Sequence, residues 1–437
     1  MFDWHSKYGD LLKDAETAVK DIKSGDFIVT GMMEPVELLR ALKNRDDLKN
    51  VMLFCAQSLQ GMIGEVANET KSDIRAVTPF IDPHPNLQKA KDAGKVDFMP
   101  ASFSSWAKIN KSVTNCNVLL LTITPPDKNG YVTLSTYPEH VVSLLDTADV
   151  VIGEVNENVP ITYGCPVMHV SRFTSIVESK TNWNFLIRDE VGEYWKDEQA
   201  KQMGGYLSEL VEDGATIELG VGGMNGNAIL NMEGVKDLGI HTEYFGDVLM
   251  ELMKKGVVNN SRKSINKGFS VATMGSGSKK FYEFVHENRA VRFMPCEYVL
   301  KMSVMTANSK FTAINTASQI DLQGQINGEF IKGKQYSGIG GQGDFAKAAC
   351  SVPDGKSIMA IASTTKNGKY SKIVPCYENR LTPITTTRND VEYVVTEFGI
   401  AQLLGQTLPQ RVENLISIAH PKFRDELTEE AKKIGLI

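Results

Sequence analysis

The fold is indicated by the segment KSGDFIVTG at residues 23–31, which recurs in altered form as EDGATIELG at residues 212–220. In both copies a polar turn containing glycine leads into a short run of β-forming residues and ends in a second glycine. Glycine at such positions allows tight turns at each end of a strand. The recurrence therefore suggests that the two halves of the chain begin with the same structural unit.

Two further pairs of segments occur in the same order. VDFMP at 96–100 resembles VRFMP at 291–295, and DVVIGEV at 149–155 loosely resembles EYVVTEF at 392–398. Three collinear pairs favour two related halves over chance. The last pair is more widely separated than the others, which places extra sequence in the second half, between Pro295 and Glu392.

Short apolar runs alternate with helical patterns along the chain. Residues 27–29, 51–54, 117–123 and 149–152 are strand candidates, and apolar residues at helical spacing over 36–42 predict a helix. Near-continuous apolar runs are typical of strands buried on both faces of a parallel sheet. The predicted fold class is α/β, with two related open domains and mainly parallel sheets, at residues 1–190 and 191–437.

Composition excludes several classes of protein. The 437 residues carry 47 basic and 53 acidic side chains, a net charge of −6, which argues against a binder of nucleic acid or of anionic membranes. The longest apolar run, at 118–123, is too short to cross a bilayer. The six cysteines include no CxxC pair, and the N-terminus has no signal-peptide pattern, so a cytoplasmic protein is expected.

Two glycine-rich loops stand out in the second half. ELGVGGM at 218–224 follows a predicted strand at 215–219, and GIGGQGD at 338–344 precedes a predicted helix at 345–349. Such loops can bring backbone N–H groups close to an anion or a developing oxyanion, although two tight turns would also explain them. The second loop fits GxGxxG, but it lacks the preceding strand and the following acid of a dinucleotide site.

A run of basic side chains lies between residues 254 and 282, where no Asp or Glu occurs. It suggests a site for a polyphosphate ligand, and a solvated basic face is the alternative. Its members are Lys254, Lys255, Arg262, Lys263, Lys267, Lys279 and Lys280.

A nucleophile candidate occurs in the segment GIHTEYF at 239–245. Apolar residues at helical spacing follow from Phe245, so Glu243 is expected just ahead of a helix, where it could face a cleft. The alternative for Glu243 is an acid stabilised by the helix dipole. For His241 a core or hydrogen-bonding role is favoured over a catalytic one. No metal-ligand spacing occurs at His84, His140, His169 and His420.

With these motifs, the chain resembles the acetyl-CoA hydrolase/transferase family, a branch of the class I CoA-transferases. Within it, the 4-hydroxybutyrate and butyrate CoA-transferases are the most similar. The matching segments cover nearly the whole chain in family order: Glu34-Pro35, 125–131, 148–156, 169–171, 212–216, 220–224, 239–245, 338–345 and 394–427.

The resemblance implies a set of site residues. Glu243, in the motif GIHTE, would be the catalytic nucleophile, and the GxGGQ loop would lie by the thioester. CoA-binding positions would be Gly220, Val221, Gly222, Gly223, Met224, Gly340, Gly341 and Lys356. No metal is expected.

The implied activity is transfer of CoA from a short-chain acyl-CoA to a carboxylic acid such as acetate, through a glutamyl-CoA thioester. An acyl-CoA hydrolase using the same glutamate, or a non-catalytic CoA sensor, are the alternatives. Acyl-CoA and carboxylate would be substrates, with no permanently bound cofactor, and the protein would be a homodimer or larger.

Three positions depart from the family pattern. Asn225-Gly226-Asn227-Ala228 replaces the usual Pro-Asn-Ala, and Leu300 stands near a position where the family has an asparagine by the thioester. Residues 163–166 read YGCP in place of His-Gly-Asp-Ser. The first two border the expected active site, so they bear on the choice of acyl group.

Overall fold

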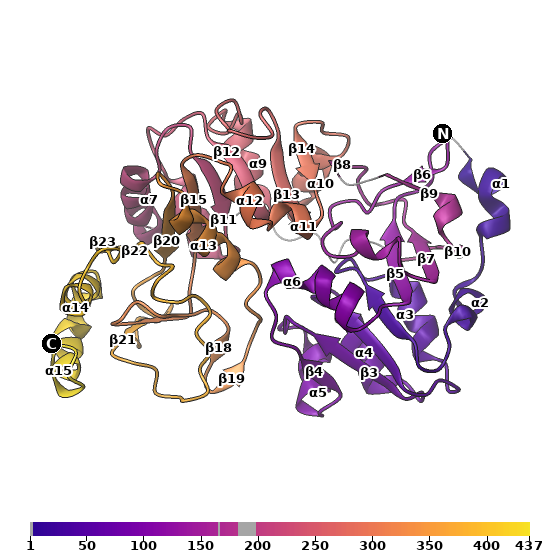
Figure 1. Ribbon diagram of the computed structural model, residues 1–437, viewed down its shortest axis with the longest axis horizontal. Coiled ribbons are helices and arrows are strands. Elements are labelled where there is room, and N and C mark those ends of the chain that lie inside the picture. Colours follow the sequence, from indigo (N-terminus) through magenta and orange to yellow (C-terminus); the bar gives the residue numbers. More distant parts are fainter. Residues whose placement is uncertain (1–2, 165–166, 182–197) are drawn as a thin grey trace. The chain divides into compact units, whose positions relative to one another are not determined.

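The computed structural model describes residues 3–164, 167–181 and 198–437, which form two compact units (Figure 1). Unit 1 comprises Met1–Arg188 and Thr273–Tyr298, and unit 2 comprises Asp189–Ala272 and Val299–Ile437. The expected domain boundary at 190/191 and Cys165 lie outside the described residues. Both units are α/β, as predicted.

Unit 1 contains a seven-stranded sheet in which every neighbouring pair is parallel. Its four predicted strands are confirmed, and β5 is buried along its whole length, as its continuous apolar run suggested. In spatial order the strands are β10 (Ser175–Glu178), β7 (Val150–Val155), β5 (Val118–Ile123), β1 (Phe27–Thr30), β2 (Val51–Cys55), β3 (Ile74–Thr78) and β4 (Val96–Phe98).

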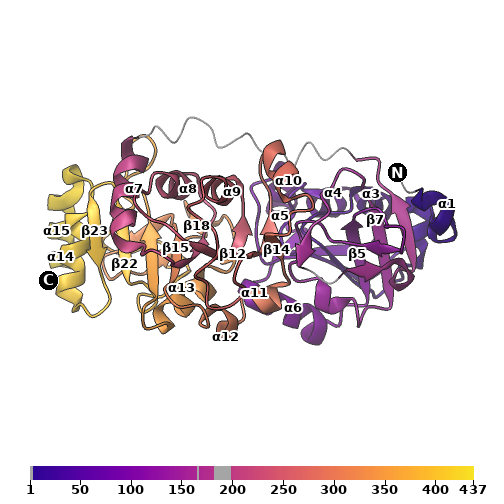
Figure 2. The ribbon, with the colours of Figure 1, turned by 90° about the horizontal axis from the view of Figure 1, so that it is seen from above.

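Helices α2 to α5 contribute the apolar side chains that pack with this sheet into the main core of unit 1. Figure 2 shows α3 and α4 side by side along it. The helices of unit 1 are α1 (Trp4–Tyr8), α2 (Ala15–Ala18), α3 (Val36–Lys43), α4 (Met62–Glu69), α5 (Pro85–Asp92), α6 (Phe103–Lys108) and α10 (Lys279–Val285). Its short outer strands are β6 (Tyr131–Val132), β8 (Tyr163–Gly164), β9 (Met168–His169) and β14 (Val291–Phe293). The short helix α11 (Cys296–Val299) lies where the chain passes to unit 2.

A buried carboxylate, Glu34, organises the start of α4. Its oxygens accept hydrogen bonds from Ser58 Oγ (2.6 Å), the Gln60 N–H (2.8 Å) and the Ile63 N–H (3.1 Å). Because the first N–H groups of a helix lack partners within the helix, a carboxylate there satisfies them and interacts favourably with the helix dipole.

Replacing Glu34 with alanine is expected to lower the free energy of unfolding by about 3 kcal/mol, since buried donors lose their acceptor. Urea denaturation measures this change. Glu69→Ala, on the exposed end of the same helix, is the matched control, with a change within about 0.5 kcal/mol. Equal effects of the two substitutions would contradict the role given to Glu34.

The main sheet of unit 2 has the strand order β23-β22-β20-β15-β11-β12, parallel except for the β22–β23 pair. These strands are β23 (Gly399–Gln402), β22 (Tyr393–Thr396), β20 (Lys356–Ala360), β15 (Phe311–Asn315), β11 (Thr216–Leu219) and β12 (Gly239–Phe245). The chain crosses between the two units within β13 (Ser270–Gly275).

In Figure 2 helices α7 (Glu198–Leu210), α8 (Gly223–Leu230) and α9 (Asp247–Lys254) lie on one face of this sheet, and α13 (Gln342–Ser351) lies on the other. Smaller elements complete unit 2: α12 (Met302–Met305), β16 (Gln319–Asp321), β17 (Ile326–Asn327), β18 (Phe330–Ile331), β19 (Lys334–Gln335), β21 (Ile373–Val374), α14 (Leu408–Ser417) and α15 (Arg424–Lys433). No helix among the described residues is long and apolar enough to span a membrane.

The repeated segments form strands in both copies: β1 and β11, β4 and β14, β7 and β22. In unit 1 one strand, β5, separates β1 from β7, whereas β15 and β20 separate β11 from β22 in unit 2. The extra sequence predicted between Pro295 and Glu392 therefore supplies an additional sheet strand and the small strands β16 to β19 and β21.

Candidate active site

Glu243 lies within strand β12, and the next helix, α9, begins at Asp247. A helix does follow Glu243, as expected, but it begins at Asp247 and not at Phe245, and Glu243 itself belongs to the strand. The acid in the first turn of that helix is Asp247. Because Glu243 belongs to a pleated strand, its side chain projects to one defined face of the sheet.

Glu218 shares this face with Glu243. The parallel register pairs Thr216 with Gly239, and side chains alternate along each strand, so Glu218, His241 and Glu243 project to the same side. Glu218 is 1% exposed and Glu243 is half-buried. Two carboxyl groups on adjacent strands are thus brought to one face of the sheet, near the ends of those strands.

The GxGGQ loop meets Glu243. The Gly341 N–H donates a hydrogen bond to the Glu243 carboxylate, at the start of α13. A Cβ at position 341 would collide with Oε2 of Glu243 and would lie 2.8 Å from Cδ2 of Leu300. Gly340 has a left-handed backbone (φ 57°), which favours glycine. The loop therefore needs glycine to approach the carboxylate.

The first glycine loop follows β11, as predicted, and leads into α8, which begins at Gly223 and includes Met224. A Cβ at Gly220 would collide with Oδ1 of Asn315 on β15, so this position also requires glycine. Val221, at the tip of the loop, is 54% exposed. Both glycine loops thus lie in unit 2, next to the strands that carry Glu218 and Glu243. Ligands of parallel α/β sheets commonly bind at such strand ends.

The electrostatic environment of Glu243 favours its neutral form. Burial raises the pKa of the Glu243 carboxyl to about 8, and nearby Asp344 adds to this rise. The hydrogen bond from the Gly341 N–H acts in the opposite direction by stabilising the carboxylate. A half-buried carboxylate with few compensating charges is less well solvated than one in water, which makes it a stronger nucleophile once it is ionised.

Glu218 and Asn315 form a buried pair that the sequence motifs did not single out. Asn315 Nδ2 donates to Glu218 Oε2 at 2.7 Å. Burial raises the pKa of Glu218 well above its ordinary value, and the neighbouring Glu243 raises it further. The signal that could have identified Glu218 is its place two residues before Gly220 in a predicted strand.

The structure confirms the hydrogen-bonding role favoured for His241. Its Nε2 lies 2.7 Å from the Val299 carbonyl oxygen, and burial with nearby Lys263 lowers the pKa of the ring to about 4. The ring is therefore neutral at pH 7 and donates through Nε2. This contact fixes the backbone immediately before Leu300, which packs near Gly341.

The basic run does not form one exposed cluster. Lys263 is fully buried, and its Nζ donates to the carbonyl oxygens of Ile240 (2.6 Å) and Phe269 (2.8 Å). Lys254 and Arg262 pair with acids of unit 2, whereas Lys279 pairs with an acid of unit 1. The run is thus divided between the two units, and Lys263 cannot contact a phosphate without leaving its buried position.

Lys356 is not brought together with the glycine loops. It lies at the start of β20, on the opposite face of the sheet from Glu218, because it aligns with Thr312 in the register. Its Nζ binds the Leu210 carbonyl oxygen and Glu212, both at 2.8 Å. The Lys356 side chain therefore projects away from the face that carries Glu218 and Glu243.

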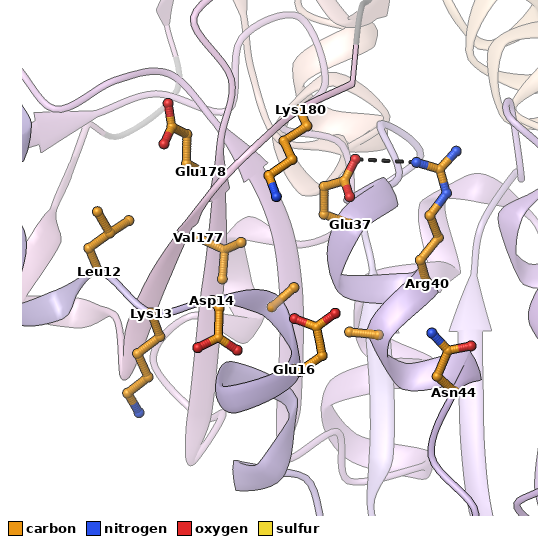
Figure 3. Close-up of a pocket in the computed structure, with 12 residues that line it drawn as sticks. Leu12, Lys13, Asp14, Glu16, Glu37, Arg40, Asn44, Val177, Glu178 and Lys180 are labelled. Carbon is orange, nitrogen blue, oxygen red and sulfur yellow. Dashed lines mark hydrogen bonds and ion pairs between the residues drawn. The ribbon is translucent and has the colours of Figure 1, made fainter.

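A separate pocket of about 490 Å³ lies in unit 1, around α2, α3 and β10 (Figure 3). Its lining mixes acids such as Glu16 and Glu37 with cations such as Lys13 and Arg40, and Glu37 pairs with Arg40 at 3.2 Å. It contains neither glycine loop nor Glu243. Within the described part of the chain, no group of three or more potential ligands is arranged to hold a metal ion.

Comparison with known proteins gives consistent matches along the chain. Residues 2–184 match the acetyl-CoA hydrolase/transferase N-terminal domain, and residues 277–431 match the corresponding C-terminal domain. The chain is 36% identical to a 4-hydroxybutyrate coenzyme A transferase of Clostridium kluyveri, over 99% of both chains. It is 32% identical to a butyryl-CoA:acetate CoA-transferase of Anaerostipes caccae, over 98% of this chain and 97% of that protein.

Solved structures agree with these matches. The crystal structure of RipA from Yersinia pestis superimposes with a TM-score of 0.87 at 31% sequence identity, and all of both chains is covered.

Proposed function

Because the chain belongs to the acetyl-CoA hydrolase/transferase family, it is an enzyme of the class I CoA-transferase type, and we propose that Glu243 is its nucleophile. The observation that carries this proposal is the close approach of the Gly341 backbone to the Glu243 carboxylate, where a Cβ would collide with Oε2, at the start of a helix. The donor is a short-chain acyl-CoA, and the acceptor is a carboxylic acid such as acetate.

In the first step a Glu243 carboxylate oxygen attacks the thioester carbonyl carbon. The carbon–sulfur bond breaks, CoA leaves as the thiolate, and a mixed anhydride of the acyl group and Glu243 remains. The thiolate then attacks the Glu243 carbonyl carbon. The first acid leaves as its carboxylate, and a glutamyl-CoA thioester is formed.

The second carboxylic acid reverses these steps and leaves as the new acyl-CoA. Each intermediate keeps an activated acyl bond, so the free energy of the thioester is conserved. When the thiolate attacks the glutamyl carbon, negative charge develops on an oxygen of Glu243. The Gly341 N–H is already directed at this carboxyl group and can stabilise that charge, an effect worth a few kcal/mol per donor.

CoA is a substrate in this proposal, and the turn at Gly220, Val221, Gly222, Gly223 and Met224 is proposed to bind it next to β11. Leu300, close to Gly341, gives the proposed site an apolar wall. That wall favours short aliphatic acyl groups, in keeping with the butyryl and 4-hydroxybutyryl relatives. A cytoplasmic location and a homodimer or larger assembly also belong to this proposal, and the oligomer rests on the family resemblance.

The donor half-reaction is expected to depend on pH through Glu243, because the reactive form is the carboxylate. Its pKa of about 8 lies above the ordinary value, so kcat/KM for the acyl-CoA should rise about tenfold per pH unit below pH 8 and level off above it. Initial rates across pH 6 to 10 measure the profile.

Stability provides an independent check on the same group. A folded-state pKa raised above the unfolded value means that the native protein holds the proton more tightly, so stability falls as pH rises from 4.5 towards about 8. Glu243→Gln has no ionisable group at this position, so it does not lose stability in this way. The difference between its melting temperature and that of the wild type should therefore grow in favour of the variant as pH rises over this range. A flat difference between pH 5 and 8.5 would contradict the raised pKa.

Transferase and hydrolase activities are separated by product analysis. With acyl-CoA and acetate, the proposal requires ping-pong kinetics and acetyl-CoA as product, while acyl-CoA alone should be consumed slowly. Free CoA released at the same rate with and without acetate would favour the hydrolase instead.

A further inference from the structure

The mechanism leaves one buried acid beside the nucleophile without a role. Glu218 is 1% exposed and projects from β11 to the face that carries Glu243 on β12. Buried carboxyl groups normally have several donors or a cation to compensate for lost hydration. Here the amide of Asn315 donates one hydrogen bond of 2.7 Å.

The groups around Glu218 favour a single negative charge on the carboxyl pair formed by Glu218 and Glu243. From β12, His241 and Glu243 project to its face, and the ring of His241 is neutral and bonded to Val299. Lys263 lies along the start of this strand, near Gly239, with its Nζ bound to two backbone carbonyls.

Among the residues that the structure describes, the remaining neighbours named for this carboxyl pair add no compensating positive charge. From β15 the Asn315 side chain contacts Glu218, and on α13 Asp344 is a further acid close to Glu243. Two adjacent carboxyl groups in such surroundings cannot both ionise without a large electrostatic cost.

Asn315 links Glu218 to the first glycine loop. Its Nδ2 is held by Glu218, and its Oδ1 packs against the backbone of Gly220, where a side chain could not fit. The orientation of this amide therefore depends on an acceptor at position 218. If Glu218 were lost, the amide could rotate, and the backbone at the start of the loop would lose its support.

We propose that Glu218 is a positioning residue that stays protonated during the reaction, orients Asn315 against Gly220, and leaves the single negative charge of the carboxyl pair on Glu243. The proposal rests on the nucleophilic role of Glu243. A neutral Glu218 still accepts the hydrogen bond of the Asn315 amide, and it does not oppose ionisation of Glu243.

Three variants test the proposal: Glu218→Gln, Glu218→Leu and, as a control for a buried glutamate elsewhere, Glu154→Gln. Glu154 is buried in unit 1 and binds the first turn of α3 through the Glu37 and Leu38 N–H groups. Glu218→Gln keeps a neutral acceptor, so kcat/KM at pH 8 should stay within about threefold of wild type. Glu218→Leu removes the acceptor and should lower it about 10- to 100-fold.

The pH profile distinguishes a neutral Glu218 from an ionised one. If Glu218 is neutral, the acid limb of the pH profile of kcat/KM has the same apparent pKa in Glu218→Gln as in the wild type. An ionised Glu218 would raise the pKa of Glu243, so its removal would shift the limb to lower pH by about one unit. Such a shift, or full activity in Glu218→Leu, would overturn the proposal.

Infrared difference spectroscopy provides a readout that needs no turnover. At pH 9 the wild type and Glu154→Gln should both show the carbonyl stretch of a protonated carboxylic acid, and Glu218→Gln should lack it. A spectrum that does not change with Glu218→Gln would refute protonation at this position even if Glu218→Leu failed to fold.

If Glu243→Ala retained transfer activity, the proposed function would fail, whereas the infrared assignment of Glu218 would stand by itself.

Discussion

Glu243→Ala is expected to abolish CoA transfer, with kcat/KM for the acyl-CoA reduced by roughly 10⁴-fold or more, as for removal of the nucleophile in other covalent enzymes. The substitution removes the atom that forms both the anhydride and the thioester. The loss should appear in kcat, because binding of CoA through its nucleotide does not need this carboxylate. Steady-state rates with butyryl-CoA and acetate measure it.

Glu243→Asp is the matched variant for this loss. It keeps the carboxylate but withdraws it by about one bond length from the Gly341 N–H, and such a displacement costs about 10²-fold in rate. An alanine variant that kept more than a tenth of wild-type activity, in a folded protein, would exclude Glu243 as the nucleophile.

Gly341→Ala is expected to give the second-largest loss, about 10²- to 10³-fold in kcat, without unfolding the protein. The new Cβ would collide with Oε2 of Glu243 and lie 2.8 Å from Cδ2 of Leu300. To relieve the clash, the carboxylate must turn away from the N–H that would stabilise the oxyanion. Rates combined with thermal unfolding separate the catalytic loss from destabilisation.

Gly343→Ala is the control for this substitution, because Gly343 lies two residues after Gly341, in the first turn of α13. A Cβ there would make ordinary contacts of 3.5 Å with Ile339 and the Thr385 carbonyl oxygen. Its activity should stay within about threefold of wild type. If both alanine variants lost the same activity, general disturbance of the helix start would explain the result better than the clash with Glu243.

Much of the framework was predictable from the sequence because buried parallel strands are continuous apolar runs. The strands β1, β2, β5 and β7 and the helix α3 were found in this way, and the repeated segments identified β11. The helix that follows Glu243 was placed too early because Phe245 fits the helical spacing, although it ends a strand. Apolar spacing alone does not show where a strand gives way to a helix.

The interior of the candidate site was harder to predict, since it depends on contacts between distant segments. Glu218 and Asn315 are 97 residues apart, and their hydrogen bond follows from strand register. Burial of Lys263 likewise depends on the carbonyls of Ile240 and Phe269. By composition it looked like a surface lysine in a basic run. Lys356 was assigned by resemblance, and the strand register turns it to the other face.

The covalent intermediate gives the most direct test of the account. The protein is incubated with butyryl-CoA without acceptor, digested, and analysed by mass spectrometry for CoA attached to the peptide that contains Glu243. The account predicts this adduct in the wild type, its discharge to acetyl-CoA when acetate is added, and its absence in Glu243→Ala. Turnover with no adduct on that peptide, or with CoA attached to another side chain, would contradict it.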